Sequence, residues 1–323
     1  MSSLFTIMKK TRFILAISLL LILNFLTACS IQTDQPTSDG KLKVVATTTI
    51  VGDVVSQIGS DLLDLNILLP VGTDPHGFDP TPQDIAKVAE ADIVFANGAG
   101  LEKFLNNLLG SAGAQDKVVE VSDGIDFLTL NEEEPGSEEQ DHNHNGIDPH
   151  TWTDPNNVMI WVDNIEQALI EIDPENIAVY TENADIYKTE LKLLDTWIRQ
   201  QIAQIPAEKR KLVTDHALFG YYAEEYGFEQ VGALVQGFST LAEPTAQNLA
   251  EIEDAIHDLN VEAIFIGNTV NPSLGKRVTE DTGTQLVFVY TGSLSNPDGE
   301  ANTYLAYMRY NTTAFVNALT PNP

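Results

Sequence analysis

Short strand-like runs alternate with helical stretches along most of this sequence, and the alternation occurs in two series. The first series follows Gly40, and its β-rich runs and helically spaced apolar residues predict strands at 42–49, 65–69, 93–96 and 118–121 and helices at 50–59, 82–90 and 101–109. Strands that alternate with helices connect through right-handed crossovers and pair in parallel. We therefore expect a parallel sheet that is covered by helices on both faces.

Two helical stretches precede the second series, and the second of them has no internal proline or glycine. Residues 155–172 have helical periodicity, and residues 174–205 can form one helix of about 30 residues, which is about 45 Å at 1.5 Å per residue. After Pro206 the pattern predicts strands at 211–214, 230–234, 263–266 and 285–290 and helices at 219–226, 246–259, 272–282 and 304–319.

These two series predict the fold class and the domains. The chain has 323 residues, which is more than one compact core usually holds. We expect an α/β fold of two lobes, each a mainly parallel sheet flanked by helices, joined by one long bridging helix. The expected boundaries are an N-terminal lobe at 41–172, a bridging helix at 173–206 and a C-terminal lobe at 207–323.

The first 40 residues predict export and lipid anchoring. Three basic residues precede an apolar run at 13–26, and this run of about 14 residues is shorter than the roughly 20 that a transmembrane helix needs. Leu26 to Cys29 resembles the lipobox of bacterial lipoproteins, and Cys29 is the only cysteine, which excludes an intramolecular disulfide. We expect a signal peptide at 1–28 and an acylated Cys29 with a flexible tether at 29–40. The protein would be extracytoplasmic and attached to membrane lipid, on the periplasmic side or the outer face.

The charge is strongly negative. The chain has 17 Lys and Arg against 47 Asp and Glu, a formal net charge of −30. This balance argues against a nucleic-acid partner, because phosphate binding needs clustered basic residues. Many acids lie in a predicted loop at 131–148, together with His142 and His144. This loop could capture cations near the protein, or it could be a solvated loop in which the two histidines are incidental.

Three histidines lie close to the predicted carboxyl ends of strands or to the acidic loop. His76 and His150 each end an Asp-Pro-His sequence, and His216 follows an aspartate. Ligands of open α/β sheets bind at the carboxyl ends of the strands. Neutral imidazole is the commonest zinc ligand, and its second nitrogen usually bonds a carboxylate or carbonyl. Each histidine alone could be a polar loop or core residue, but together they are candidate metal ligands.

Several motifs resemble those of a known family. They lie at 74–84 (DPHGFDPTPQD), 91–98 (ADIVFANG), 148–155 (DPHTWTDP), 216–222 (HALFGYY) and 304–311 (YLAYMRYN). They resemble the zinc- and manganese-binding solute-binding lipoproteins of ABC transporters, called the cluster A-I or metal-binding adhesin-like family. The resemblance implies two α/β lobes with a metal ion between them, and an ABC permease in the membrane as partner. It places His76 and His150 in the N-terminal lobe and His216 in the C-terminal lobe. An adhesion role fits the family name but has no chemical signature in the sequence.

The resemblance also bears on which metal binds. Manganese-binding members usually have a carboxylate at the third position and an aspartate in the last strand-end motif, where this chain has His216 and Gly292. Three imidazoles suit Zn²⁺, whereas Mn²⁺ favours carboxylate oxygens, so we expect Zn²⁺, with Mn²⁺ as the alternative. Asp215, Asp298 and Glu300 are candidates for a fourth ligand or a nearby acid. Asp141 to His144 resembles a short form of the His-rich insertion of zinc-specific members.

An extracytoplasmic zinc hydrolase is the alternative function. Three histidines and an open coordination position also describe catalytic zinc. The sequence has neither a His-Glu-x-x-His motif nor a serine nucleophile elbow. We therefore expect a metal-capture protein and not an enzyme.

Overall fold

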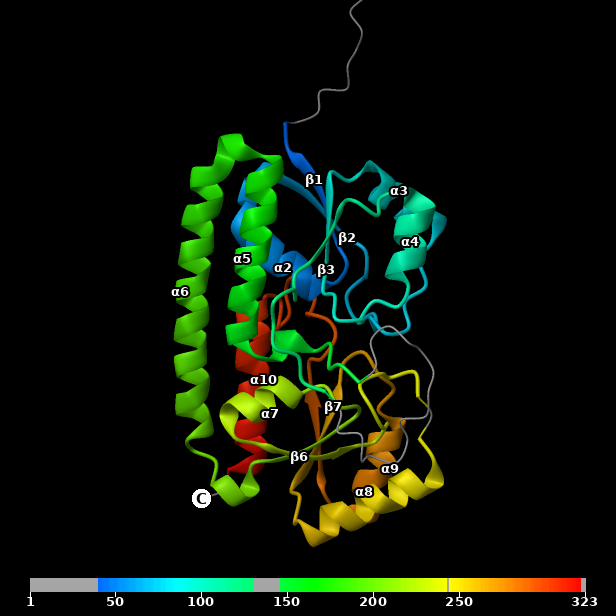
Figure 1. Ribbon diagram of the computed structural model, residues 1–323. Coiled ribbons are helices and arrows are strands. Elements are labelled where there is room, and N and C mark those ends of the chain that lie inside the picture. The colour runs from blue at the N-terminus through cyan, green and yellow to red at the C-terminus, as the bar shows by residue number, and fades with distance from the viewer. Residues whose placement is uncertain (1–39, 130–145, 243, 321–323) are drawn as a thin grey trace, which may run out of the picture. The chain divides into compact units, whose positions relative to one another are not determined.

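A parallel sheet forms the centre of the N-terminal lobe in the computed structural model, which describes residues 40–129, 146–242 and 244–320 (Figure 1). Its strands are β1 (Leu42–Ala46), β2 (Leu63–Ile67), β3 (Ile93–Ala96) and β4 (Val118–Glu120). They pair in parallel in the order β2-β1-β3-β4. The helices of this lobe are α2 (Thr49–Gly59), α3 (Pro82–Glu90), α4 (Leu105–Ala112) and α5 (Pro155–Ile172).

Alternate residues of this sheet face two different helical layers. Val44 and Ala46 of β1 belong to the hydrophobic cluster that contains α2 and α5. Val45 between them belongs to the cluster that contains α3 and α4. Because successive side chains of a strand point to opposite faces, a strand with a layer on each side has a continuous apolar sequence. Both faces of the sheet are therefore covered, as the sequence predicts.

The C-terminal lobe repeats this topology. Its strands are β5 (Lys211–Thr214), β6 (Glu229–Ala233), β7 (Ala263–Gly267) and β8 (Gln285–Val289), and they pair in parallel in the order β6-β5-β7-β8. Its helices are α7 (Gly220–Tyr226), α8 (Ala246–Asp258), α9 (Ser273–Thr282) and α10 (Tyr304–Leu319). Buried residues of α7 and α10 pack on one face of the sheet, and those of α8 and α9 pack on the other.

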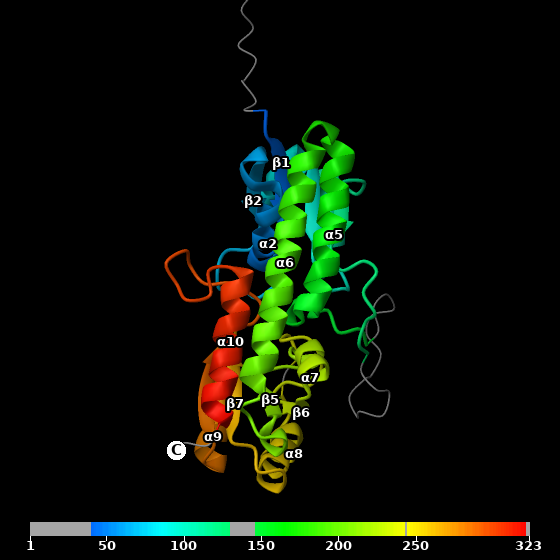
Figure 2. The ribbon, with the colours of Figure 1, turned by 90° about the vertical axis from the view of Figure 1, so that its left-hand side faces the viewer.

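Helix α6 (Ile177–Ile202) runs along both lobes (Figures 1 and 2). It contacts α2 and α5 of the N-terminal lobe and α10 of the C-terminal lobe. Its 26 residues span about 39 Å at 1.5 Å per residue. Buried residues of α6 join both sheets in one continuous hydrophobic cluster that extends from Val44 of β1 to Leu319 of α10. The predicted fold class, two parallel-sheet lobes joined by a long helix, is confirmed.

Some element ends differ from the sequence prediction. The predicted strand at 65–69 occurs at Leu63–Ile67, because β2 pairs with β1 from Leu63 opposite Leu42. The predicted helix at 101–109 begins only at Leu105, and the carboxylate of Glu102 before it accepts the backbone N–H groups of Asn97 and Gly98. The long helix begins after a 3₁₀ turn at Pro174–Asn176.

The predicted signal peptide, Cys29, the tether up to residue 39 and loop residues 131–145 lie outside the described residues. The two ends of the acidic loop meet, since Thr129 and Ile147 form an antiparallel bridge. Among the helices that the structure describes, none combines the length and the apolar character needed to cross a membrane.

Candidate metal centre

Three buried histidines converge between the lobes. His76 lies after β2, His150 directly before the turn that leads into α5, and His216 after β5. One ring nitrogen of each lies within 4.8 Å of the other two, and the ring centroids are 5.0 to 5.4 Å apart. The Nε2 atoms of His76 and His150 are 3.1 Å apart. Tetrahedral zinc with Zn–N bonds of 2.0–2.1 Å separates its nitrogens by about 3.3 Å, so His76 and His150 already have the separation of two zinc ligands, and His216 lies close enough to be the third candidate.

The two Asp-Pro-His sequences have the same local structure. Oδ1 of Asp74 accepts the backbone N–H of His76 at 3.0 Å, and Oδ1 of Asp148 accepts that of His150 at 2.9 Å. In each turn, the aspartate bonds the backbone two residues ahead, and the proline between them fixes its own φ. Both histidines of the N-terminal lobe are thus held on short, stiff backbone turns.

Carboxylates orient two of the imidazoles. Oδ1 of Asp148 lies 2.7 Å from Nδ1 of His150, and Oδ1 of Asp215 lies 2.7 Å from Nδ1 of His216. An Nδ1–H that donates to a carboxylate leaves the lone pair on Nε2, which is the atom that then binds metal. Nε2 of His216 is buried and has no hydrogen-bond partner among the described residues, so it is available to a cation.

Burial also keeps the imidazoles of His76 and His150 neutral. It is the main cause that lowers the pKa of His76 and His150 well below the ordinary 6.5, and the neighbouring histidines lower it further. Burial raises the pKa of Asp148 to about 8. Burial would also raise the pKa of Asp215, but His216 and the hydrogen bonds to Asp215 outweigh it and lower that pKa. Since metal binding needs unprotonated imidazole, the lowered pKa values of His76 and His150 favour binding at neutral pH.

The candidates for a fourth ligand lie in different places. Asp215 is next to the cluster, but its Oδ1 accepts from His216 and its Oδ2 accepts the N–H of Gly267 at 2.8 Å. Asp298 is exposed, and Glu300 lines a groove between β8 and α10. The structure does not bring these two carboxylates to the histidines. His142 and His144 lie outside the described residues.

Six further residues line the cavity at the three histidines, and the sequence did not predict them as a group. They are Asp74, Pro75, Trp152, Leu218, Thr269 and Gly292. Asp74 is the one carboxylate among them, and its oxygens accept from the N–H of His76 and the hydroxyl of Thr240. Within the part of the chain that the structure describes, the candidate metal-binding atoms grouped here are therefore the three imidazole nitrogens.

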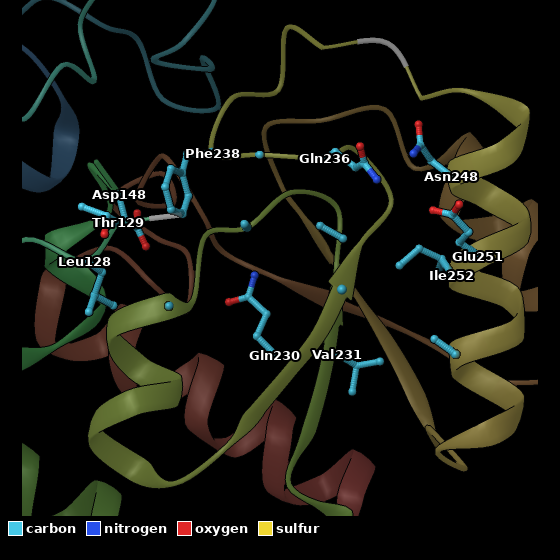
Figure 3. A pocket seen from close by; sticks show the side chains of 16 residues that line it. Leu128, Thr129, Asp148, Gln230, Val231, Gln236, Phe238, Asn248, Glu251 and Ile252 are labelled. Atoms are coloured by element: carbon cyan, nitrogen blue, oxygen red, sulfur yellow. The ribbon is translucent and has the colours of Figure 1, made fainter. Parts of the chain in front are cut away.

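A larger pocket of about 450 Å³ adjoins the centre at Asp148 (Figure 3). Figure 3 shows Asp148 on one side of it, Asn248 and Glu251 of α8 on the opposite side, and Gln230 of β6 between them. None of the three histidines lines this pocket. It shares one wall with the candidate metal centre but is separate from it.

The contact between Asp74 and Thr240 could not be found from the sequence. The hydroxyl of Thr240 donates to Oδ2 of Asp74, and the two residues are 166 positions apart. Phe238, near Thr240, lies with its ring centroid 6.3 Å from that of His150. The segment after β6 therefore reaches both N-terminal histidine turns, although no motif marks it.

Comparison with known proteins identifies the family. A family model described as "Zinc-uptake complex component A periplasmic" (ZnuA) matches residues 44–318. The chain is 33% identical over 314 residues to the manganese-binding lipoprotein MntA of Halalkalibacterium halodurans, over 97% of this chain and 99% of that protein. It is 30% identical over 319 residues to the manganese ABC transporter substrate-binding lipoprotein PsaA of Streptococcus pneumoniae, with coverage of 97% and 99%.

Two solved structures with the same fold are also named as metal-binding proteins. The periplasmic zinc binding protein TroA from Treponema pallidum has a TM-score of 0.77 at 26% identity, with 87% of this chain and 100% of that chain covered. A Mn-bound periplasmic metal binding protein from Candidatus Liberibacter asiaticus has a TM-score of 0.74 at 27% identity, with coverage of 86% and 99%. These relatives are solute-binding proteins, so the expectation that the chain is not an enzyme is confirmed and the hydrolase alternative is set aside. The chain belongs to the zinc-uptake complex component A family, the metal-binding substrate-binding lipoproteins of ABC transporters.

Proposed function

We propose that this protein captures Zn²⁺ between its two lobes with His76, His150 and His216 and delivers it to an ABC permease. The observation that carries the proposal is the convergence of three buried ring nitrogens, two of them on imidazoles oriented by a carboxylate. Capture needs neither a general base nor a nucleophile. The histidines belong to both lobes, so that a bound ion ties the lobes together.

The donor set supports zinc as the ion. Imidazole nitrogen suits Zn²⁺, which accepts four ligands in a tetrahedron, whereas Mn²⁺ favours carboxylate and water oxygens in an octahedron. Gly292 contributes no side-chain donor to the cavity, and both oxygens of Asp74 are already hydrogen-bonded. Water or hydroxide would then complete the coordination.

Manganese is the second candidate, and the names of relatives favour it. MntA and PsaA are both named for manganese, and both match this chain over nearly their full length. The names are not uniform, because TroA is named for zinc and one related structure is Cd-bound. Transport of both ions by one protein is compatible with these relatives.

The place of action follows from the N-terminal sequence and the relatives. MntA and PsaA are named lipoproteins, and TroA is named periplasmic. We propose that Cys29 is acylated and holds the protein at the membrane, on the extracytoplasmic side where its permease is found. Two or more acyl chains would give stable anchoring.

Metal competition distinguishes the two ions. Chromophoric chelators would give the Zn²⁺ and Mn²⁺ affinities of the mature protein, and elemental analysis would give its metal content when it is purified without added metal. We expect zinc in the purified protein and a much higher affinity for Zn²⁺ than for Mn²⁺. Replacing the exposed His257 of α8 by Ala is the control and should leave both affinities unchanged. Manganese as the bound ion, with the higher affinity, would contradict the zinc assignment.

A further inference from the structure

Two glycines of the C-terminal lobe lie against the two Asp-Pro-His turns. A Cβ added at Gly292 would lie 2.7 Å from Cδ and 3.1 Å from Cγ of Pro75, the residue before His76. A Cβ added at Gly220 would lie 2.5 Å from Oδ2 of Asp148, two residues before His150. The same kind of contact therefore occurs at both histidines of the N-terminal lobe.

Neither glycine is needed for its backbone conformation. Both have φ values outside the left-handed region that favours glycine. An alanine could adopt either backbone without strain. What each position requires is space, because the facing turn approaches to a distance that leaves no room for a side chain.

We propose that Gly292 and Gly220 are positioning residues that set how closely the two Asp-Pro-His turns approach His216, and so set the size of the metal site. The inference rests on the proposed function, since it assumes that these histidines bind the ion. It adds a structural reason why the site would select Zn²⁺ over larger ions. Close approach would keep the ring nitrogens near one another, as the 3.1 Å between Nε2 of His76 and Nε2 of His150 illustrates. This favours Zn²⁺ over a larger ion that also binds imidazole, such as Cd²⁺.

The contact at Gly292 leaves the facing turn little freedom to adjust. Carbon atoms in contact normally lie about 3.5–4.0 Å apart. An alanine at 292 would therefore have to push Pro75 away from residue 292 by about 1 Å. The ring of Pro75 is closed onto its own backbone and cannot rotate away. The displacement therefore passes to His76, whose Nε2 lies 3.1 Å from that of His150.

The contact at Gly220 acts through a carboxylate. Oδ1 of Asp148 is held by both the backbone N–H and Nδ1 of His150. A Cβ at residue 220 would push Oδ2 and rotate the carboxylate away from these two bonds. This change would loosen the orientation of the His150 ring, whereas the change at 292 would move His76 as a whole.

Metal selectivity tests the proposal. Zn²⁺ and Cd²⁺ affinities are measured by chelator competition for the mature wild type, Gly292→Ala, Gly220→Ala and Gly110→Ala. Gly110 is the matched control, because a Cβ there meets only Nε2 of Gln115 at 3.7 Å. We expect Zn²⁺ affinity to fall about tenfold or more in the first two variants and Cd²⁺ affinity to fall clearly less. Gly110→Ala should change neither affinity.

A second variant separates the contact from a general loss of structure. Pro75→Ala removes Cγ and Cδ, the two atoms that an alanine at 292 would meet. In a Pro75→Ala background, Gly292→Ala should therefore change Zn²⁺ affinity by less than about twofold, because a double-mutant cycle isolates the coupling of the two residues. An undiminished loss in that background would overturn the proposal.

The outcomes also separate this inference from the proposed function. If His216→Ala abolishes zinc binding but Gly292→Ala and Gly220→Ala lower the Zn²⁺ and Cd²⁺ affinities equally or not at all, the histidine site stands and the inference about the glycines fails. If His216→Ala leaves zinc binding unchanged, the proposed function itself fails, and with it the inference.

Discussion

The substitution Asp215→Asn tests how this protein prepares an imidazole for metal. Oδ1 of Asp215 accepts from both the backbone N–H and Nδ1 of His216, and Oδ2 accepts the N–H of Gly267. An asparagine has nearly the same shape but only one oxygen. If its oxygen faces His216, its NH₂ group meets the N–H of Gly267; if it is reversed, its NH₂ group meets the donors of His216.

The expected loss has two parts. A buried donor without a partner costs about 1–3 kcal/mol, which lowers the stability of the metal-free protein. In the reversed orientation, the amide also favours the tautomer with hydrogen on Nε2 of His216, which cannot bind metal. Loss of such a carboxylate partner typically lowers metal affinity 10- to 100-fold, about 1.4–2.7 kcal/mol.

Two assays and one control separate these parts. Chelator competition gives the Zn²⁺ affinity, and urea unfolding with EDTA gives the stability of the metal-free protein. Asp84→Asn is the matched control, because Asp84 is a buried carboxylate that accepts from Thr81 at the start of α3 and from Lys87 within it, and not from a histidine. It should lower stability and leave Zn²⁺ affinity unchanged. An Asp215→Asn protein that is folded and binds Zn²⁺ as tightly as the wild type would refute the reasoning.

Three further predictions concern a buried acid, the acidic loop and the lipid anchor. Burial raises the pKa of Glu102 from 4.5 to about 7, so folding favours its protonated form. Its contribution to stability should decline by about 3 kcal/mol as pH rises from 4.5 to about 7, at about 1.4 kcal/mol per pH unit. Urea unfolding of Glu102→Gln across this range should therefore show a decline that is smaller than that of the wild type by about this amount, and an equal decline would contradict the assignment. Deleting residues 132–145, which include His142 and His144, should leave zinc binding at the main site intact and remove any weaker second binding event; unchanged stoichiometry and affinities in calorimetry would contradict a capture role. Cys29→Ala should move the protein from the membrane to the soluble fraction on cell fractionation, and full retention at the membrane would argue against the lipid anchor.

The sequence predicted those elements whose ends carry local signals. Helix α5 begins at Pro155, as expected, because Asp154 caps it and a proline suits the first turn. The ends of β2 were misplaced because pairing with β1 decides them: Leu68 and Leu69 still bond the backbone of Ala46 and Thr47, but they lie beyond the strand. Register of this kind depends on a partner strand that local sequence does not identify.

The candidate site was also predictable only where local sequence determines the structure. Asp-Pro-His occurs twice, and each copy forms its own turn from neighbouring residues, so both histidines could be found by reading along the chain. The contacts of Gly292 with Pro75 and of Gly220 with Asp148 join residues far apart in the sequence. No local pattern encodes them, because they arise only when the two lobes pack along α6.

The most direct test of the central claim is calorimetric titration of Zn²⁺ into the mature protein with His76, His150 and His216 all replaced by alanine. The account predicts that tight binding is lost, while circular dichroism shows an intact fold. Zinc binding as tight as that of the wild type would contradict it, because the ion would then be held by other residues.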